Sequence, residues 1–187
     1  MTDKERAIEN ILNFLNNPND KRLLLKGYDD DAKLRVTLGC LNKEFTKGII
    51  RTNYMADIAY NVNRAFQKKM LPEPIKSTIN YRLGSMIVNI SSYSRHTKFN
   101  PRGNQETFTL FFPVQSVFDN PNRYENFLQE LDETNSRKII LLTTNEHSIS
   151  NWDIENHVDQ IYFYDVENDN PELMTNMRNN GAFKKSK

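Results

Sequence analysis

The residues most suited to binding a ligand lie between Gly27 and Leu34, in the segment GYDDDAKL. Gly27 and Lys33 match the first glycine and the lysine of the pattern G-x-x-x-x-G-K-[ST], whose backbone N–H groups and lysine hold phosphate oxygens. Ala32 replaces the second glycine, and Leu34 replaces the hydroxyl residue that would ligate Mg²⁺. Three consecutive aspartates stand where phosphate would bind. The segment therefore has the layout of a phosphate-binding loop without most of its chemistry.

Apolar runs and helical periodicities alternate along the chain. Four segments place apolar residues on one helical face, at residues 5–15, 29–45, 55–70 and 124–131. Five short apolar runs predict buried strands, at residues 22–26, 47–52, 86–90, 138–145 and 160–166. Residues 75–84 fit a loop or an extra strand, and residues 107–117 fit a strand or a helix.

Strands that alternate with helices predict an α/β fold: a three-layer α/β/α domain with a mainly parallel five-stranded sheet. A chain of 187 residues is long enough for one such domain, which we expect at residues 21–170. Residues 1–20 add an N-terminal helix and linker, and residues 171–187 add a C-terminal helix and a loose basic tail.

Ligands of parallel sheets bind at the carboxyl ends of the strands. Because right-handed crossovers bring these ends to one edge, we expect the Gly27 loop, Asn89–Ser92 and Thr143–Asn145 to meet there. The edge would then combine three polar segments.

The order of these motifs resembles the core of P-loop NTPases, and more narrowly the AAA+ type, over residues 20–166. RLLLKGYDDDAKL is similar to the first strand and Walker A loop, SMIVNISS to the Walker B strand, and KIILLTTN to the sensor-1 strand. HSISNWDIENHVDQIYFYDVEND is similar to the stretch that leads into the fifth strand. The resemblance implies that Gly27, Lys33, Thr144 and Asn145 would contact a nucleotide, with ATP or ADP and Mg²⁺ as ligands.

The same comparison shows which catalytic groups are missing. The acidic pair of Walker B would fall near Ser91 and Ser92, and neither side chain can polarise a water. The box that could supply an arginine finger reads His157-Val158-Asp159. We therefore expect no catalytic residues, no hydrolysis and no cofactor. The alternative to a nucleotide loop is a helix start with acidic N-terminal residues, which favour the positive end of the helix dipole.

A rival interpretation of the same segment is a Mg²⁺-dependent nuclease. Asp20 and Asp31-x-Lys33 resemble the D…(D/E)-x-K arrangement, in which two carboxylates hold Mg²⁺ and the lysine positions a water. Residues 32–41 distinguish the two interpretations, because a helix there supports the P-loop-like layout and a strand supports the nuclease.

A basic stretch interleaved with aromatic residues runs from Tyr93 to Arg102. Arg95, Lys98 and Arg102 are its candidate nucleic-acid contacts, and Phe99 could stack on a base. A solvated loop is the alternative. The three histidines lie far apart without metal-ligand spacing, so we expect no metal site.

Composition limits the classes of function. Twenty-five Lys+Arg against 24 Asp+Glu give a net charge of +1, so no global field draws the chain to nucleic acid or to an anionic membrane. No stretch approaches the ~18 apolar residues of a membrane span. The single cysteine, Cys40, lies among apolar residues, as a structural thiol would in a reducing compartment. We expect a cytoplasmic protein without a membrane partner.

Inactive AAA+ relatives often act as partners or subunits in nucleic-acid-handling assemblies. The resemblance therefore implies a non-catalytic interaction or scaffold module with a protein partner, and with nucleic acid as a second partner through residues 93–102. Two enzymatic alternatives stay open: weak nucleotide binding or ATPase activity through Gly27 and Lys33, and a nuclease that uses Asp20, Asp31 and Lys33.

Overall fold

The computed structural model describes residues 1–118, 120–144 and 152–182, which form a seven-stranded sheet in the order β3-β4-β2-β5-β6-β1-β7. The strands are β1 (Arg22–Lys26), β2 (Lys47–Thr52), β3 (Asn80–Leu83), β4 (Met86–Ser92), β5 (Thr107–Phe111), β6 (Lys138–Leu142) and β7 (Gln160–Phe163). All neighbouring pairs are parallel except β3 and β4, which form an antiparallel hairpin. The fold is α/β with a mostly parallel sheet.

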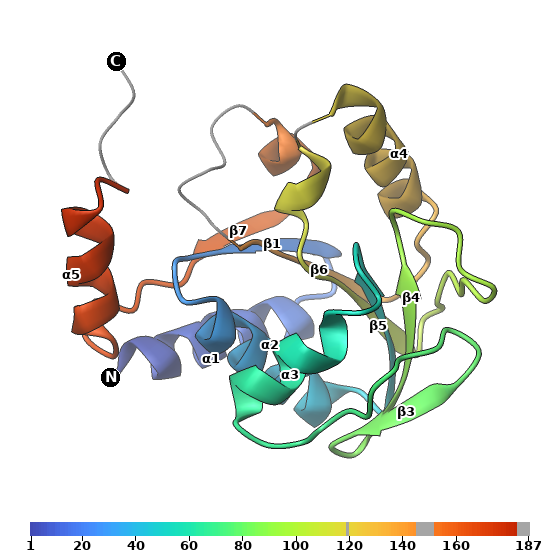
Figure 1. Ribbon diagram of the computed structural model, residues 1–187, viewed down its shortest axis with the longest axis horizontal. Helices are drawn as coiled ribbons and strands as arrows, with labels where there is room; N and C mark the ends of the chain where they lie inside the picture. The colour runs from blue at the N-terminus through green and yellow to red at the C-terminus, as the bar shows by residue number, and fades with distance from the viewer. Residues whose placement is uncertain (119, 145–151, 183–187) are drawn as a thin grey trace.

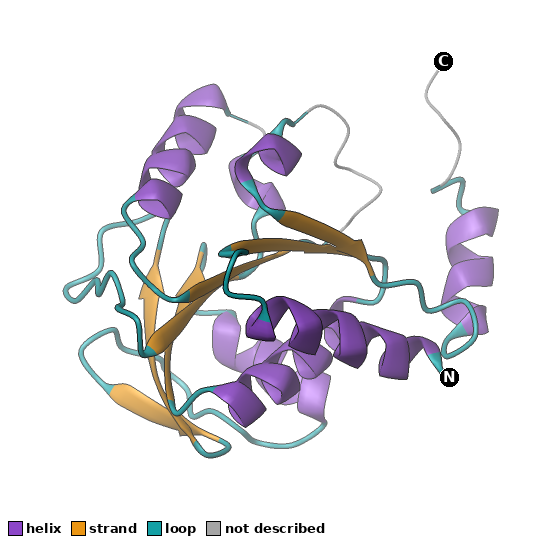
Figure 2. Cartoon of the chain, turned by 180° about the vertical axis from the view of Figure 1, so that it is seen from behind, coloured by secondary structure: helices purple, strands orange, loops and turns teal. Residues whose placement is uncertain are grey.

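Helices cover both faces of this sheet (Figure 1 and Figure 2). One face carries α1 (Asp3–Asn16), α2 (Asp30–Glu44) and α3 (Ile58–Phe66), and the other carries α4 (Pro121–Asp132) with the 3₁₀ helices η1 (Gln115–Val117) and η3 (Ile154–His157). Side chains alternate along a strand, so Leu23 and Leu25 of β1 enter the first core and Leu24 enters the second.

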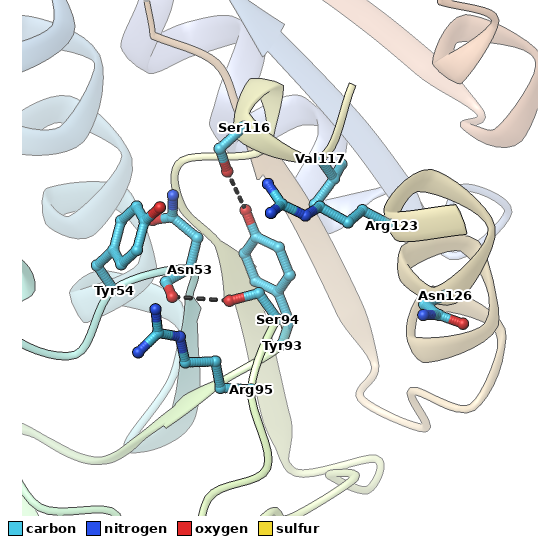
Figure 3. Close-up of a pocket in the computed structure, with 9 residues that line it drawn as sticks. All are labelled: Asn53, Tyr54, Tyr93, Ser94, Arg95, Ser116, Val117, Arg123 and Asn126. Atoms are coloured by element: carbon cyan, nitrogen blue, oxygen red, sulfur yellow. Dashed lines mark hydrogen bonds between the residues drawn. The ribbon is translucent and has the colours of Figure 1, made fainter. Parts of the chain in front are cut away.

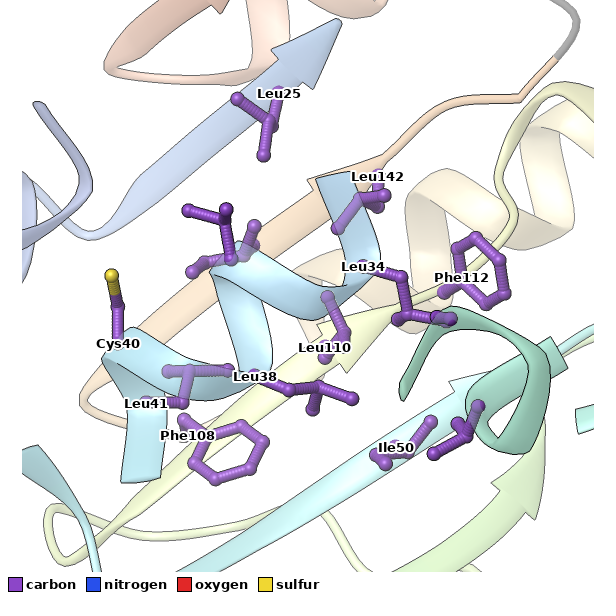
Figure 4. Close-up of a cluster of buried hydrophobic side chains, with 14 of the residues drawn as sticks. Leu25, Leu34, Leu38, Cys40, Leu41, Ile50, Phe108, Leu110, Phe112 and Leu142 are labelled. Atoms are coloured by element: carbon purple, nitrogen blue, oxygen red, sulfur yellow. The ribbon is translucent and has the colours of Figure 1, made fainter. Parts of the chain in front are cut away.

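Helix α2 lies on the middle of the sheet and contributes much of the larger core (Figure 4). Its Leu34, Leu38 and Leu41 are buried in one cluster with Leu110 of β5. Cys40 belongs to the same cluster and is 2% exposed, which confirms a buried structural thiol. Burial raises the pKa of this thiol to about 11, so the reactive thiolate is suppressed.

The structure has two strands more than the five predicted. β3 and β5 come from the two segments whose structure the sequence left undecided. β5 lies in the interior of the sheet, between β2 and β6, and four of its five residues are buried. The strands predicted at 138–145 and 160–166 end earlier, at Leu142 and Phe163, and the helix predicted at 55–70 is limited to α3.

The N-terminal helix shares the larger core, since Ala7, Ile11 and Phe14 of α1 are fully buried in it. The chain after β7 returns to the start of α1, where Asp3 accepts hydrogen bonds from the backbone of residues 168 and 169. Helix α5 (Pro171–Asn179) follows beside the N-terminus (Figure 1) and buries Met174. No helix of the described residues is long and apolar enough to cross a membrane.

Candidate functional site

At two places in the sheet, neighbouring parallel strands send their next connections to opposite faces. At the first place, β1 leads into α2 on one face and its neighbour β6 leads towards η3 on the other. At the second place, β2 leads into α3 on the first face and its neighbour β5 leads into η1 and α4 on the other. Such divergence opens a crevice beyond the carboxyl ends of the strands, where α/β proteins bind ligands. These two places are named the β1/β6 crevice and the β2/β5 crevice.

The side chain of Lys33 fills the β1/β6 crevice. Its Nζ donates hydrogen bonds to the carbonyl oxygens of Gly27 and Thr143, each at 2.6 Å, and lies 3.1 Å from Asp30 Oδ1. The residue is fully buried, at 0% exposure. An ammonium group has three N–H donors, and these contacts are enough to occupy them. Lys33 therefore ties the end of β1 to the end of β6.

Each of the three aspartates in this segment has a partner within the chain. Asp29 is the N-cap of α2, and its Oδ1 accepts a hydrogen bond from the helix backbone at 2.8 Å. Asp31 pairs with Arg64 of α3 at 2.9 Å, and Asp30 lies beside Lys33. Helix α2 begins at Asp30, so the segment is a helix start with acidic N-terminal residues, as one alternative predicted.

The other residues predicted to contact nucleotide also have structural roles here. Gly27 has φ +144°, and a Cβ at this position would lie 2.6 Å from the carbonyl oxygen of Tyr164. The backbone N–H of Thr144 donates to Gln115 Oε1 at 2.8 Å, and the Gln115 amide donates to Thr144 Oγ1. Asn145 lies outside the described residues.

The segment compared with Walker B does not reach the Gly27 loop. It ends β4, and the strands β2, β5 and β6 separate β4 from β1. With neighbouring strands about 4.8 Å apart, Ser91 and Ser92 lie roughly 19 Å from β1 across the sheet. The three segments lie at the same edge of the sheet, as predicted, because β1, β6, β5, β2 and β4 are all parallel. The expected convergence is wrong for Asn89–Ser92, although Thr143 does meet Gly27 through Lys33.

The structure does not assemble the nuclease arrangement. Residues 32–41 are helical, within α2. Asp20 precedes β1, whereas Asp31 and Lys33 follow it, so the length of the strand separates the two carboxylates. Asp20 instead accepts a hydrogen bond from Gln160 at 2.5 Å.

Whereas Lys33 occupies the space between the ends of β1 and β6, the β2/β5 crevice holds an open pocket of about 140 Å³ (Figure 3). Asn53 and Tyr54 line it from the end of β2, Ser94 and Arg95 from the end of β4, and Arg123 from the first turn of α4. Two guanidinium groups thus share one small cavity with amide and hydroxyl groups. Such a lining suits a negatively charged group.

The turn after β4 positions Arg95. Ser92 Oγ accepts hydrogen bonds from the backbone N–H groups of Ser94 and Arg95, at 3.2 and 3.0 Å. Ser94 Oγ donates to the carbonyl oxygen of Asn53 at 2.7 Å, which joins the ends of β4 and β2. The Arg95 guanidinium lies 5.8 Å from the centroid of the Tyr54 ring. Among the residues that the structure describes, no carboxylate forms an ion pair with Arg95.

Tyr93 forms the buried wall of the pocket. Its ring packs against Phe111 and Phe127, with centroids 5.8 and 5.3 Å away, and is 6% exposed. Its hydroxyl donates to the carbonyl oxygen of Pro113 and lies 3.2 Å from Ser116 Oγ (Figure 3). Burial raises the pKa of this hydroxyl, so the wall carries no negative charge at neutral pH.

An ion-pair network lies next to this pocket, between the sheet and α4. Arg51 of β2 is 1% exposed, and its Nη2 lies 2.5 Å from Glu130 Oε2 and 3.0 Å from the carbonyl oxygen of Ser92. Arg102 pairs with the same carboxylate at 2.5 Å and with Glu133 at 2.9 Å. Burial lowers the pKa of Arg51, and the charge of Glu130 opposes this effect. The network holds α4 against the sheet.

The three predicted nucleic-acid contacts therefore lie in different places. Arg95 lines the pocket, and Lys98 is exposed on the loop that follows. The guanidinium of Arg102 forms ion pairs with Glu130 and Glu133, in and just after α4. The residue lies beside Lys47 and Gly48, at the amino end of β2. Asn53, which also lines the pocket, came from no predicted site.

No protein-family model matches this chain, and no curated protein matches it with significant similarity. The function is therefore inferred from the geometry of the two crevices.

Proposed function

We propose that this chain is a non-catalytic domain with a P-loop NTPase-like, AAA+-like layout that acts as an interaction or scaffold module. The observation that carries the proposal is the buried ammonium of Lys33, bound to the carbonyl oxygens of Gly27 and Thr143. A lysine that serves a nucleotide must present its ammonium to phosphate. Lys33 would first have to leave two backbone acceptors in a buried site, at about 1–3 kcal/mol for each group left unsatisfied.

The surroundings of Lys33 support the same conclusion. The carboxylate of Asp29 already accepts a hydrogen bond from the first turn of α2, where a phosphate would otherwise bind. β6 pairs with β5 on the side away from β1. The four residues after β5 are Phe112-Pro113-Val114-Gln115, which include an amide but no acid. An amide cannot act as a general base towards water. Both features favour a binding domain over a nucleotide hydrolase.

The arrangement of strands supports the P-loop NTPase-like layout. β1 lies between β6 and β7, which are the strands that the sequence compares with sensor 1 and with the fifth strand. Helix α2 follows β1 directly, as a helix follows a phosphate-binding loop. Helices on both faces of the sheet complete a three-layer α/β/α arrangement in this proposal.

Thermal unfolding with ligands tests the proposal. The purified chain is melted alone and with millimolar ATP, ADP or GTP, each with and without Mg²⁺. A ligand at one hundred times its Kd would stabilise the folded state by about 2.7 kcal/mol, which is roughly 5–10 °C for a chain of this size. We expect Tm shifts below about 1 °C with every nucleotide.

A shift of several degrees with a nucleotide would contradict the proposal and favour the alternative through Gly27 and Lys33. A shift with Mg²⁺ alone would show a metal site that the proposal does not contain, but not one built from Asp20 and Asp31, which the length of β1 separates. Sodium sulfate at matched ionic strength is the control, because salts that are excluded from protein surfaces also raise Tm.

A further inference from the structure

We infer that the β2/β5 crevice binds one phosphate group of a single-stranded nucleic acid. Arg95 offers it a guanidinium group, whose forked N–H donors match phosphate oxygens, and Arg123 lines the opposite side from α4. Asn53, Ser94 and Asn126 add amide and hydroxyl groups (Figure 3). This crevice is separate from Lys33, so the inference stands whether or not the β1/β6 crevice binds a nucleotide.

The size of the pocket decides between a whole molecule and one group of a larger ligand. A cavity of about 140 Å³ is smaller than the roughly 300–1,000 Å³ of pockets that enclose small-molecule ligands. It accommodates a phosphate but not a complete nucleotide with its base. The remainder of the ligand must therefore continue over the surface, as a strand with repeating phosphates would.

The mouth of the pocket carries a ring that could receive a base. The side chain of Tyr54 is 49% exposed, and Arg95 lies above its ring. Exposed aromatic rings stack on unpaired bases in proteins that bind single strands, whereas a duplex keeps the faces of its bases hidden. His96 and Lys98 are also exposed on the loop that continues from Arg95. These features favour a single strand over a duplex.

The pocket is formed before any ligand binds, because buried contacts fix its walls. The Arg51–Glu130 pair holds α4 near the sheet, and the Tyr93 hydroxyl is bonded to the carbonyl oxygen of Pro113. Ser94 is fixed by its hydrogen bond to Asn53. A preformed site loses less conformational entropy on binding, so even a small contact area can give measurable affinity.

Fluorescence anisotropy with a labelled single-stranded oligonucleotide of about ten thymidines, at roughly 50 mM salt, tests the inference. We expect Arg95→Gln and Tyr54→Ala each to weaken binding about tenfold, because each removes a charged contact or a stacking ring. The matched control is Arg82→Gln, which removes the same charge from an exposed position on β3. Urea unfolding of every variant shows that the fold is intact.

The salt dependence gives a second, quantitative readout. Contact with one phosphate predicts a slope of log K against log salt of about −0.7. Loss of Arg95 should make this slope smaller, whereas loss of Tyr54 should leave it unchanged. A purely structural role for Arg95 would not produce this difference.

Competition with inorganic phosphate, with adenosine monophosphate and with a duplex of the same length identifies the source of the phosphate. We expect all three to compete at least about tenfold more weakly than the single strand. Equal affinity for the monophosphate would overturn the inference in favour of a small phosphorylated ligand. Absence of oligonucleotide binding, or equal losses for Arg95→Gln and Arg82→Gln, would also overturn it. A nucleotide-dependent rise in Tm that persists in Arg95→Gln would contradict only the proposed function.

Discussion

The two crevices of this sheet show how one position in a fold can be closed or open. In the β1/β6 crevice, residues 27–29 join strand to helix, and the short connection brings the first turn of α2 down onto the strand ends. Lys33 then reaches the carbonyl oxygens of Gly27 and Thr143. In the β2/β5 crevice, residues 53–57 separate β2 from α3, and the longer connection leaves a pocket.

The comparison teaches that a cation at the end of a strand is not by itself a ligand site. What decides its role is whether buried acceptors already use its donors. Lys138, at the amino end of β6, shows the structural case again: its Nζ donates to the carbonyl oxygen of Phe14 at 2.9 Å, and the residue is 3% exposed. Arg95 shows the opposite case, with an exposed guanidinium at the mouth of a cavity.

The largest expected effect comes from removing the ammonium that closes the β1/β6 crevice. Lys33→Met keeps the apolar stem but leaves two buried carbonyl groups without their donor, so we expect the free energy of unfolding to fall by about 3 kcal/mol. Urea denaturation measures this value. Lys43→Met, at an exposed position of the same helix, is the control and should change stability by less than about 0.5 kcal/mol. Equal effects for the two variants would mean that the crevice is not closed by Lys33.

Two glycines on either side of this lysine sharpen the test. Gly27→Ala would place a Cβ 2.6 Å from the carbonyl oxygen of Tyr164, at φ +144°, and should destabilise the fold by about 1–3 kcal/mol. Gly39→Ala lies in α2, where a Cβ meets nothing within 4 Å, and should stabilise it by about 0.4–1 kcal/mol. Thermal or urea unfolding compares the two. A tolerated Gly27→Ala would show that the backbone of this loop can relax, as a phosphate-binding loop would need to.

The sequence predicts the part of this fold that depends on local pattern. The apolar runs identify five strands, and the acidic residues before α2 predict its start, because capping acts within one turn. β5 could not be assigned because its aromatic residues fit a strand or a helix equally well. Only its pairing with both β2 and β6 fixes it as a strand. β3 is a four-residue strand whose pairing depends on the turn at Gly84.

The candidate sites depend on contacts that local pattern does not contain. In the sequence, Lys33 fits the pattern of a nucleotide contact. Its structural role is not visible there, because its partner Thr143 is 110 residues away. Arg95 could be singled out by its basic neighbourhood, but Arg123 lies just before the helix predicted at residues 124–131 and belongs to no motif. Only the sheet order brings the two arginines together. Polar residues directly after a predicted strand, such as Asn53, were the one signal that could have pointed to this pocket.

Two arginines of the segment 93–106 allow the same comparison between a paired cation and a cation at a pocket, with a smaller expected change in stability. Arg102 pairs with Glu130 and Glu133, whereas Arg95 forms no ion pair among the residues that the structure describes. We expect Arg102→Gln to lower the free energy of unfolding by about 1 kcal/mol, since its partners are partly exposed. Arg95→Gln should change it by less than about 0.5 kcal/mol. Urea unfolding at low and high salt measures both, and a larger loss for Arg95→Gln would indicate that this arginine is structural.

The last expected effect concerns the support of the β1/β6 crevice at low pH. Asn170 donates to Asp29, the N-cap of α2, at 3.0 Å, and Asp3 holds the chain just before it. Burial alone would raise the pKa of Asp3, but hydrogen bonds from Asn168 and from the residue 169 backbone lower it to about 2. A carboxyl group with a depressed pKa stabilises the fold above its ordinary pKa of 3.8, and this contribution is lost as the pH falls towards 2.

Asp3→Asn should therefore be less stable than the wild type at pH 7 and should lose less stability between pH 4 and pH 2. Urea unfolding across this range measures the difference. Glu9→Gln, at an exposed position of the same helix, removes a charge without these hydrogen bonds and should stay close to wild-type stability at pH 7. The affinity of the β2/β5 crevice for an oligonucleotide should be unaffected by Asp3→Asn, because the two crevices are supported by different contacts. A parallel loss of affinity would show that they are coupled through the sheet.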